Sequence, residues 1–328
     1  MTEKNVIQTI HDTLWDSMKA DDRVLIMGED VGARGGVFRA TAGFLDEFGE
    51  QRVIDTPLAE SSIVGCAIGM AMHGLLPVAE IQFADFIHPA FDQLVSEAAR
   101  IRYRSAGDWD CPIVVRAPYG GGVHGALYHS QSIEAFYGHV PGLKVVVPST
   151  PYDVKGILIA SINDPDPVLF LEHKKTYRLI KGEVPDEAYE VPIGKADVKR
   201  EGEDLTVIAY GLMLHQALEA ANRLEEEEGF GAEVVDVRTI APLDKETIFD
   251  SVRRTGKAMV IYEDNRTFGA GAEISASIAE ELMFDLDAPV VRIGGPDIPA
   301  MPYSTPLEHF YLPDTEAIYE RLRELAKF

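Results

Sequence analysis

The spacing of apolar residues alternates along the chain between short unbroken runs and a helical period. Short runs bounded by polar or turn residues predict buried strands at 23–27, 77–82, 113–116, 143–147 and 168–171. A helix is predicted near the N-terminus, where Val6, Ile10, Leu14 and Met18 recur at every fourth position. Further helices are predicted after Glu60 and at 86–105 and 151–162. Strands that alternate with helices are typical of parallel βαβ units, so we expect a parallel sheet with helices on both faces.

A second set of alternating elements follows residue 204. It comprises strands at 205–210, 232–237, 258–264 and 289–293 and helices at 212–227, 244–254 and 271–284. The stretch before it, 173–204, is charged, contains two prolines and has no sustained apolar period, which is typical of a domain boundary. We therefore predict an α/β protein of two domains, 1–180 and 205–328, joined by a linker at 181–204.

The composition is that of a globular protein and argues against two classes of partner. Of the 328 residues, 46% are apolar and 26% are charged, and the formal net charge is −24. An acidic surface repels phosphates, which argues against a nucleic-acid partner. No apolar run approaches the roughly 18 residues that span a membrane. The two cysteines, Cys66 and Cys111, lack metal-ligand or redox spacing, so we expect a reduced, cytoplasmic setting.

A glycine pattern after the strand at 113–116 resembles a dinucleotide site. Gly120, Gly122 and Gly125 match G-x-G-x-x-G, but the next strand ends in Pro148 rather than in an acid that could bind a ribose hydroxyl. No long helix follows Gly125, and the phosphate-loop pattern is absent from the chain. We therefore expect a glycine-rich turn that brings the backbone close to some ligand.

Glu60 stands between a proline-bearing turn and a long apolar segment. An unpaired polar group in apolar surroundings costs roughly 2–7 kcal/mol, and a charge costs more, so this carboxylate needs a partner. One interpretation is a first-turn acid that interacts with the helix dipole while Ser61 or Ser62 caps the helix. The other is a ligand-binding carboxylate at the start of a helix, where Gly65 and Gly69, one turn apart, let another backbone approach.

Seven segments, in order and spread over nearly the whole chain, carry a resemblance to one family. They are GEDVG (28–32), DTPLAE (55–60), EIQFADFIHPAFDQ (80–93), IRYRS (101–105), VHGALYHSQS (123–132), PGLKVVVPSTPYD (141–153) and GGPDIPAMPYS (294–304). Together with the Glu60, Gly65 and Gly69 spacing, they resemble the beta subunit of a thiamine-diphosphate-dependent 2-oxo acid dehydrogenase first component. The resemblance implies an N-terminal thiamine-pyrimidine-binding domain with a parallel sheet and a C-terminal α/β domain like that of transketolase.

The resemblance gives four residues a place around the cofactor. Glu60 would bind the aminopyrimidine ring of thiamine diphosphate and stabilise its protonated or imino form. Leu58 and Gln82 would lie beside the cofactor, and Phe86 would stack on its pyrimidine ring. Taken alone, Phe86 would be an ordinary core aromatic at the head of a helix, but the surrounding EIQFADF favours the cofactor.

Two further residues receive catalytic roles from the resemblance. His129, in LYHSQS, would hold the carboxylate of the 2-oxo acid and assist acyl transfer to lipoamide, since imidazole donates hydrogen bonds and exchanges protons near neutral pH. A lone histidine is more often structural, and His124 is expected to pack within its loop. Glu29, in GEDVG, would belong to an acidic relay near a subunit contact; its alternative is a solvated acid at a strand end.

The family also has a structural potassium site, formed largely by backbone carbonyl groups. Such ligands leave almost no side-chain signature. By resemblance the site maps onto Ile113, Ser161, Ile162, Asp164 and Asp166.

The motif for the second half of the active site is missing from this chain. In the superfamily, a G-D-G motif with a downstream asparagine holds the magnesium-bound diphosphate, and the chain has no G-D-G. We therefore expect an alpha subunit to supply this half, in an assembly of two alpha and two beta subunits. The lipoyl-bearing dihydrolipoyl acyltransferase is the other partner that the resemblance implies.

The implied reaction is the oxidative decarboxylation of a 2-oxo acid with transfer of the acyl group to a lipoyl group. EIQFADF and GALYHSQS are most similar to the branched-chain enzyme, although pyruvate and acetoin dehydrogenase beta subunits share much of the pattern. Two alternatives are a non-catalytic scaffold with this fold and a self-sufficient thiamine enzyme. The set Glu60, Phe86 and His129 argues against the first, and the missing diphosphate motif argues against the second.

Overall fold

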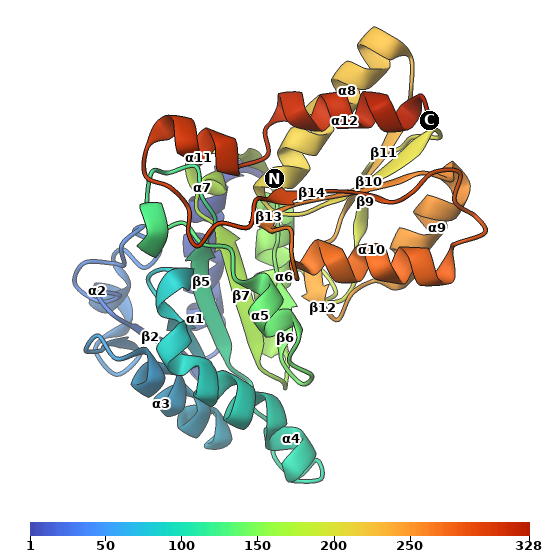
Figure 1. Ribbon diagram of the computed structural model, residues 1–328. Coiled ribbons are helices and arrows are strands. Elements are labelled where there is room, and N and C mark those ends of the chain that lie inside the picture. The colour runs from blue at the N-terminus through green and yellow to red at the C-terminus, as the bar shows by residue number, and fades with distance from the viewer. The chain divides into compact units, whose positions relative to one another are not determined.

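The computed structural model describes residues 1–328, which form two compact units. The first unit comprises residues 1–119 and 136–193, and the second comprises residues 120–135 and 194–328. Both are α/β, as predicted (Figure 1). The division at Ile193 falls inside the expected linker 181–204, whose limits stay a prediction. None of the helices combines the length and the apolarity that crossing a bilayer requires.

The first unit is built on a parallel sheet. Its strands are β1 (Thr2–Asn5), β2 (Val24–Gly28), β3 (Val53–Asp55), β4 (Leu76–Glu80), β5 (Val114–Tyr119), β6 (Lys144–Val146), β7 (Val168–His173) and β8 (Lys181–Val184). Its helices are α1 (Val6–Ala20), α2 (Phe44–Phe48), α3 (Glu60–Met72), α4 (Ile101–Arg104), α6 (Pro151–Asn163) and α7 (Thr176–Leu179), and α5 (Glu134–Gly138) begins at the end of segment 120–135. Six strands lie side by side in the order β6-β7-β5-β4-β2-β3, all parallel, and β1 and β8 form a separate antiparallel pair.

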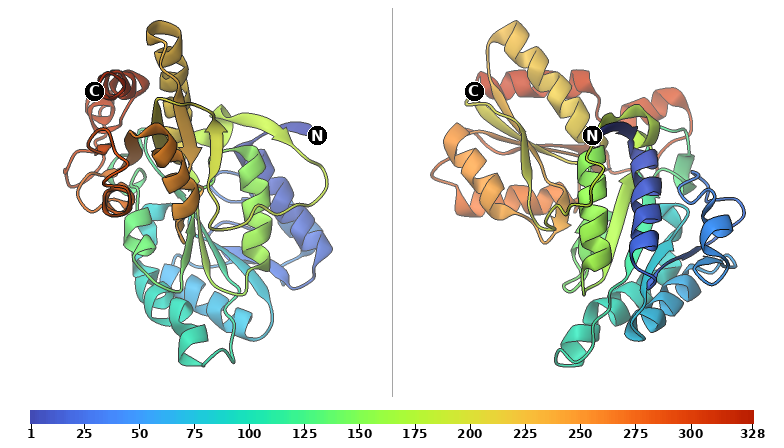
Figure 2. Two further views of the ribbon diagram at one scale, coloured as in Figure 1. Left: turned by 90° about the vertical axis from the view of Figure 1, so that its right-hand side faces the viewer. Right: turned by 180° about the vertical axis from the view of Figure 1, so that it is seen from behind.

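Helices cover the sheet because its strands are apolar on both faces, as in other parallel sheets. Helices α1 and α6 lie side by side on one face and share a core with Val24 and Ile26 of β2 (Figure 2). Leu25 and Met27 alternate with them and are also buried, so they face the opposite side. The start of α1 is fixed by a capping box, in which the side chain of Asn5 accepts the N–H of Gln8 and the reverse bond is also present.

The segment predicted as one long helix at 86–105 is helical but irregular. It consists of η1 (Ala84–Phe86), η2 (His88–Ala90), the π-helical η3 (Gln93–Glu97), η4 (Ala98–Arg100) and α4. Leu94, Ala98 and Ile101 are buried, so the apolar period that motivated the prediction is real. The prediction of a regular α-helix was nevertheless wrong, because tight and wide turns alternate along the segment, which is frequent near functional sites.

The second unit is a smaller α/β sandwich. Its strands are β9 (Asp197–Arg200), β10 (Leu205–Ala209), β11 (Ala232–Asp236), β12 (Thr239–Ala241), β13 (Ala258–Asn265) and β14 (Val291–Gly295). Its helices are η5 (Ala126–Tyr128), α8 (Leu212–Glu228), α9 (Lys245–Thr255), α10 (Ala270–Glu281), α11 (Thr305–Tyr311) and α12 (Thr315–Ala326). The sheet order is β14-β13-β10-β11-β9, with β9 antiparallel to the parallel strands, and α8 and α12 pack together on one face (Figure 1).

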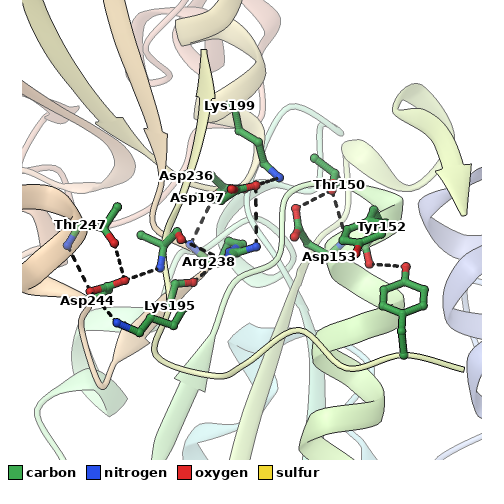
Figure 3. A network of polar contacts seen from close by, with 12 residues as sticks. Thr150, Tyr152, Asp153, Lys195, Asp197, Lys199, Asp236, Arg238, Asp244 and Thr247 are labelled. Carbon is green, nitrogen blue, oxygen red and sulfur yellow. Dashed lines mark hydrogen bonds and ion pairs between the residues drawn. The ribbon is translucent and has the colours of Figure 1, made fainter. Parts of the chain in front are cut away.

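Polar contacts attach the first residues of the second unit to its sheet. The carboxylate of Asp244 caps α9 by accepting the N–H of Thr247 at 3.3 Å. It also accepts from the hydroxyl of Thr247 at 2.7 Å and from the N–H of Ala196 at 3.0 Å (Figure 3). Arg238 donates to the carbonyl oxygens of Lys195 and Ala196 at 2.9 Å (Figure 3). Residues 195–196 are therefore held in place before β9 begins.

A buried ionic cluster joins three neighbouring strands of the first unit. Arg116 on β5 donates to Glu172 on β7 at 2.6 and 2.9 Å and to Glu80 at the end of β4 at 2.9 Å, and all three side chains are at most 5% exposed. The hydroxyl of Tyr177 donates to Glu172 at 2.5 Å. Burial raises the pKa of Glu80, and the charge of Arg116 opposes that rise. The guanidinium thus makes two buried carboxylates tolerable beneath the carboxyl ends of the strands.

Replacing Arg116 by methionine is expected to lower the free energy of unfolding by about 3–5 kcal/mol, because it leaves two carboxylates buried without a counter-charge. Chemical denaturation of the purified chain measures the change. The matched control is Arg23→Met, since Arg23 pairs with Asp21 on the surface with 61% of its side chain exposed. That variant should lose less than about 1 kcal/mol. Equal losses in the two variants would contradict the role given to the buried cluster.

Candidate functional site

The carboxyl ends of β3, β2 and β4 lie next to one another. Gly28, the last residue of β2, is in register with Asp55 at the end of β3 and with Glu80 at the end of β4. The segments that follow these strands therefore leave the sheet side by side. Open α/β sheets bind their ligands at this edge. These segments carry five of the residues that the resemblance singled out, Glu29, Leu58, Glu60, Gln82 and Phe86.

Glu60 is the first residue of α3 and is half-buried. Its carboxylate forms no hydrogen bond or ion pair within the chain. Ser61 and Ser62 do not cap the helix, because Ala59 is the N-cap residue, whereas Glu60 does lie in the first turn, as the helix-dipole interpretation expects. The helix dipole favours a negative charge at this end, but no side chain or backbone donor meets it. The carboxylate is consequently available to a donor from outside the chain.

The segments that follow β4 and β3 place one polar side chain, Gln82, and two apolar ones, Phe86 and Leu58, at this edge. Gln82, just after β4, donates from its Nε2 to the carboxylate of Asp30 at 3.5 Å. Phe86 is half-buried in η1 and lies edge-to-face with Phe83, with ring centroids 5.6 Å apart. Leu58 is 72% exposed. A ligand at this edge would cover apolar surface that water otherwise contacts.

Glu29 lies close enough to Glu60 for the two carboxylates to influence each other. Burial raises the pKa of Glu29, and the negative charges of Asp30 and Glu60 raise it further, while Arg34 opposes the rise. The place of Glu29 in a relay near a subunit contact stays a prediction.

His129 belongs to the second unit, through segment 120–135. The segment begins with a tight turn in which Gly120 and Gly122 have φ of +85° and +77°, so the expected glycine-rich turn is present. Its amides, however, meet carboxylates of the same unit rather than a ligand. The N–H of Gly121 donates to Glu263, and the N–H of Gly122 donates to Glu308 at 3.0 Å.

Glu308 also contacts His124, the histidine expected to pack within the loop. Its Oε2 lies 2.6 Å from Nδ1 of His124, and its Oε1 accepts the N–H of that residue at 3.2 Å. His129 is half-buried, and its N–H donates to the carbonyl of Ala126 at 3.3 Å. The sequence analysis did not identify Glu308, because its partner Gly122 is 186 residues away and no local pattern marks the pair.

The five residues assigned to potassium lie around the ends of α6 and β5. The carboxylate of Asp164 accepts from Nζ of Lys144 at 2.6 and 2.5 Å, and that of Asp166 accepts from Arg102 at 2.6 Å. The N–H of Asp164 donates to the carbonyl of Ser161 at 3.4 Å, and the carbonyl of Ile113 accepts from Val168 at 2.9 Å. The carboxylates of Asp164 and Asp166 thus already have cationic partners. Only backbone carbonyl oxygens, including that of Ile162, would be left to hold an ion.

A second buried acidic group lies at the end of segment 120–135. The side chain of Glu134 is fully buried, and its Oε1 accepts from the hydroxyl of Tyr210 at 2.8 Å. Burial, with the nearby charge of Asp264, raises the pKa of Glu134 to about 8. Burial likewise raises the pKa of Asp264 to about 6. At neutral pH the folded protein therefore keeps a proton on Glu134.

This proton makes the stability of the second unit depend on pH. An unfolded glutamate loses its proton near pH 4.5, whereas Glu134 in the folded state keeps it to about pH 8. Stability must then fall as the pH rises across this window, by on the order of 5 kcal/mol in total. Glu134→Gln lacks this loss, so its advantage over the unmodified chain should grow from pH 5 to pH 8 in chemical denaturation. A difference that stays constant with pH would contradict the raised pKa.

The coupling between Glu29 and Glu60 gives a prediction for titration of the chain. Glu60→Gln removes one of the charges that raise the pKa of Glu29, so this pKa should fall toward its ordinary value. Carbon-detected NMR of the glutamate carboxyl groups measures the shift. Glu47→Gln, a change at an exposed ion pair with Lys19, is the control and should leave Glu29 unchanged. An unchanged pKa in the Glu60 variant would mean that the two carboxylates are not neighbours.

Comparisons with known proteins agree on one family over the whole chain. Residues 3–180 match the transketolase pyrimidine binding domain, and residues 194–318 match the transketolase C-terminal domain. A split gene transketolase, described as an inactive beta4 tetramer, superposes with a TM-score of 0.78 over 98% of each chain at 23% identity, which shows the shared fold.

Two curated relatives align with this chain over its full length and over their own full length. The sequence is 58% identical over 328 residues to the 2-oxoisovalerate dehydrogenase subunit beta of Bacillus subtilis (strain 168). It is 49% identical over 328 residues to the pyruvate dehydrogenase E1 component subunit beta of the same organism. The chain therefore belongs to the transketolase-like family of beta subunits of 2-oxo acid dehydrogenase first components.

Proposed function

We propose that the chain is the beta subunit of a branched-chain 2-oxo acid dehydrogenase and binds the pyrimidine end of thiamine diphosphate. The observation that carries the proposal is the half-buried carboxylate of Glu60, which has no partner within the chain and stands at the carboxyl edge of a parallel sheet. When bound, thiamine diphosphate supplies the carbanion chemistry that decarboxylation of a 2-oxo acid requires.

The residues of this chain bind and orient rather than carry out the carbon chemistry. Glu60 would accept a hydrogen bond from the aminopyrimidine ring and so bind and orient that end of the cofactor. Phe86 offers an aromatic face to the ring, and Leu58 and Gln82 line the same edge. His129 binds the substrate carboxylate and exchanges a proton during acyl transfer to the lipoyl group. Glu29, with its raised pKa, holds or passes a proton beside Glu60.

Partners complete the site in this proposal. An alpha subunit holds the diphosphate and magnesium, because the G-D-G motif is absent here, and two subunits of each kind assemble. A lipoyl-bearing dihydrolipoyl acyltransferase receives the acyl group. Backbone carbonyl oxygens of Ile113, Ser161, Ile162, Asp164 and Asp166 hold a potassium ion in this proposal, since cations already neutralise the carboxylates of Asp164 and Asp166.

The preference for a branched-chain substrate rests on identity. The chain shares 58% of its residues with a 2-oxoisovalerate dehydrogenase subunit and 49% with a pyruvate dehydrogenase subunit, both over the full length. Pyruvate or acetoin is the alternative substrate. A non-catalytic assembly scaffold with the same fold is the alternative from a different class, and an unpartnered carboxylate at a ligand-binding edge argues against it.

The test is steady-state kinetics of the chain reconstituted with the alpha subunit, thiamine diphosphate and magnesium. The complex should turn over 2-oxoisovalerate with a higher kcat/KM than pyruvate or acetoin, and the chain alone should be inactive. A higher kcat/KM with pyruvate or acetoin would transfer the assignment to that enzyme, and turnover by the chain alone would contradict the shared site.

Glu60→Gln tests the residue that carries the proposal. Loss of a positioned acidic group typically costs a factor of about 10²–10⁴, so kcat of the reconstituted complex should fall by at least 100-fold. Glu47→Gln is the matched control, because Glu47 forms an exposed ion pair with Lys19 and should leave kcat unchanged. Full activity of both the Glu60→Gln and His129→Ala complexes would favour the scaffold.

A further inference from the structure

Segment 120–135, which carries His129, is attached through the N–H groups of Gly121 and Gly122 to two carboxylates of the second unit, those of Glu263 and Glu308. We propose that one of them, Glu308, is a positioning residue that sets the place of the His129 imidazole. The inference rests on the proposed function, since it assumes that His129 handles the substrate. Glu308 itself touches neither substrate nor cofactor in this scheme and acts through the loop.

The contacts of Glu308 are made with one short stretch of the loop. Its side chain is 1% exposed and projects from α11. Its Oε1 accepts the N–H groups of Gly122 and His124 at 3.0 and 3.2 Å, and its Oε2 lies 2.6 Å from Nδ1 of His124. Two of these contacts hold backbone N–H groups and the third holds the ring of His124, so one buried side chain fixes residues 122–124.

The loop needs such an anchor because its conformation is unfavourable in itself. His124 and Ala126 both have left-handed backbones, with φ of +57° and +54°. Residues with a Cβ adopt this region rarely, and they keep it only where the surroundings determine it. At His124, the contacts of its backbone N–H and its ring with Glu308 hold the left-handed conformation in place.

Close packing connects the anchored stretch to His129. Gly125 follows His124 directly, and a Cβ built on Gly125 would lie 2.7 Å from the Cβ of His129 and 2.8 Å from its carbonyl oxygen. The backbone at 125 thus lies against the backbone of His129 without space between them. The N–H of His129 is in turn bonded to the carbonyl of Ala126. A shift at residue 124 therefore moves the histidine.

Through these contacts, Glu308 affects the rate of the reaction by holding His129 in place. Misplacing a catalytic group by about 1 Å can cost about 100-fold in rate. Removal of the Glu308 carboxylate releases the N–H groups of Gly122 and His124 and lets the strained turn relax. His129 then loses its position, although its side chain and the cofactor-binding edge of the first unit are unchanged.

The experiment is a double-mutant cycle in the reconstituted complex with 2-oxoisovalerate. Glu308→Ala should lower kcat by about 10- to 100-fold while the complex still assembles at its normal mass. In a His129→Ala background, Glu308→Ala should have no further effect, because the group that it positions is already absent. Multiplicative losses in the double variant would mean that Glu308 acts on activity without His129, and would overturn the inference.

Rescue and control variants separate positioning from general damage. Glu308→Gln keeps an oxygen that can accept both N–H groups and should recover most of the activity; a variant as slow as Glu308→Ala would contradict positioning through the backbone. Glu316→Ala, at an exposed glutamate of α12 in the same unit, should leave kcat unchanged. If Glu308→Ala does not fold, Gly125→Ala displaces His129 with Glu308 intact and should show the same dependence on His129.

The outcomes also distinguish this inference from the proposed function. Wild-type activity in His129→Ala would overturn the role of His129 and, with it, the inference. Loss of activity in His129→Ala together with full activity in Glu308→Ala would overturn the inference alone. Loss in both single variants, with no further loss in the double variant, is the expected result.

Discussion

An unpaired carboxylate at the amino end of a helix is the constraint on which the candidate site depends. Glu60 is half-buried, lacks a donor within the chain and lies near Glu29, whose pKa is raised partly by the charge of Glu60. Folding therefore leaves two acidic groups in an arrangement that is electrostatically unfavourable without a ligand. Strain of this kind persists where function uses it, and a donor from a bound ring would relieve it.

Elsewhere in the molecule, buried carboxylates all have partners, and the contrast strengthens the interpretation of Glu60. Glu80 and Glu172 share Arg116 beneath the carboxyl edge of the sheet. Glu263 and Glu308 accept backbone N–H groups of the glycine-rich turn. With 54 acidic residues the chain has many carboxylates, and those taken deep into the structure are neutralised or hydrogen-bonded. Glu60 is an exception at the one edge where ligands bind in such sheets.

The elements that sequence could predict are those determined by local apolar pattern. The strand predicted at 205–210 is β10 (Leu205–Ala209), and the helix predicted at 212–227 is α8 (Leu212–Glu228). Segment 86–105 shows the limit, because apolar spacing places residues on a face but does not determine whether each turn is tight or wide. Helix α12 was missed although Ile318, Leu322 and Leu325 have helical spacing after the capping Asp314.

In the candidate site, too, local motifs predict some residues, whereas contacts between residues far apart in the sequence could not be predicted. Glu29, Glu60 and Gln82 follow the ends of neighbouring parallel strands, so their motifs together with the sheet rule already predict that they share an edge. The bond between Glu308 and Gly122 spans 186 residues and has no motif, since any glutamate at the right place in space would serve. The bond lies entirely within the C-terminal unit. Because that unit holds segment 120–135, the residue expected to bind substrate depends on a part of the chain that contains none of the cofactor motifs.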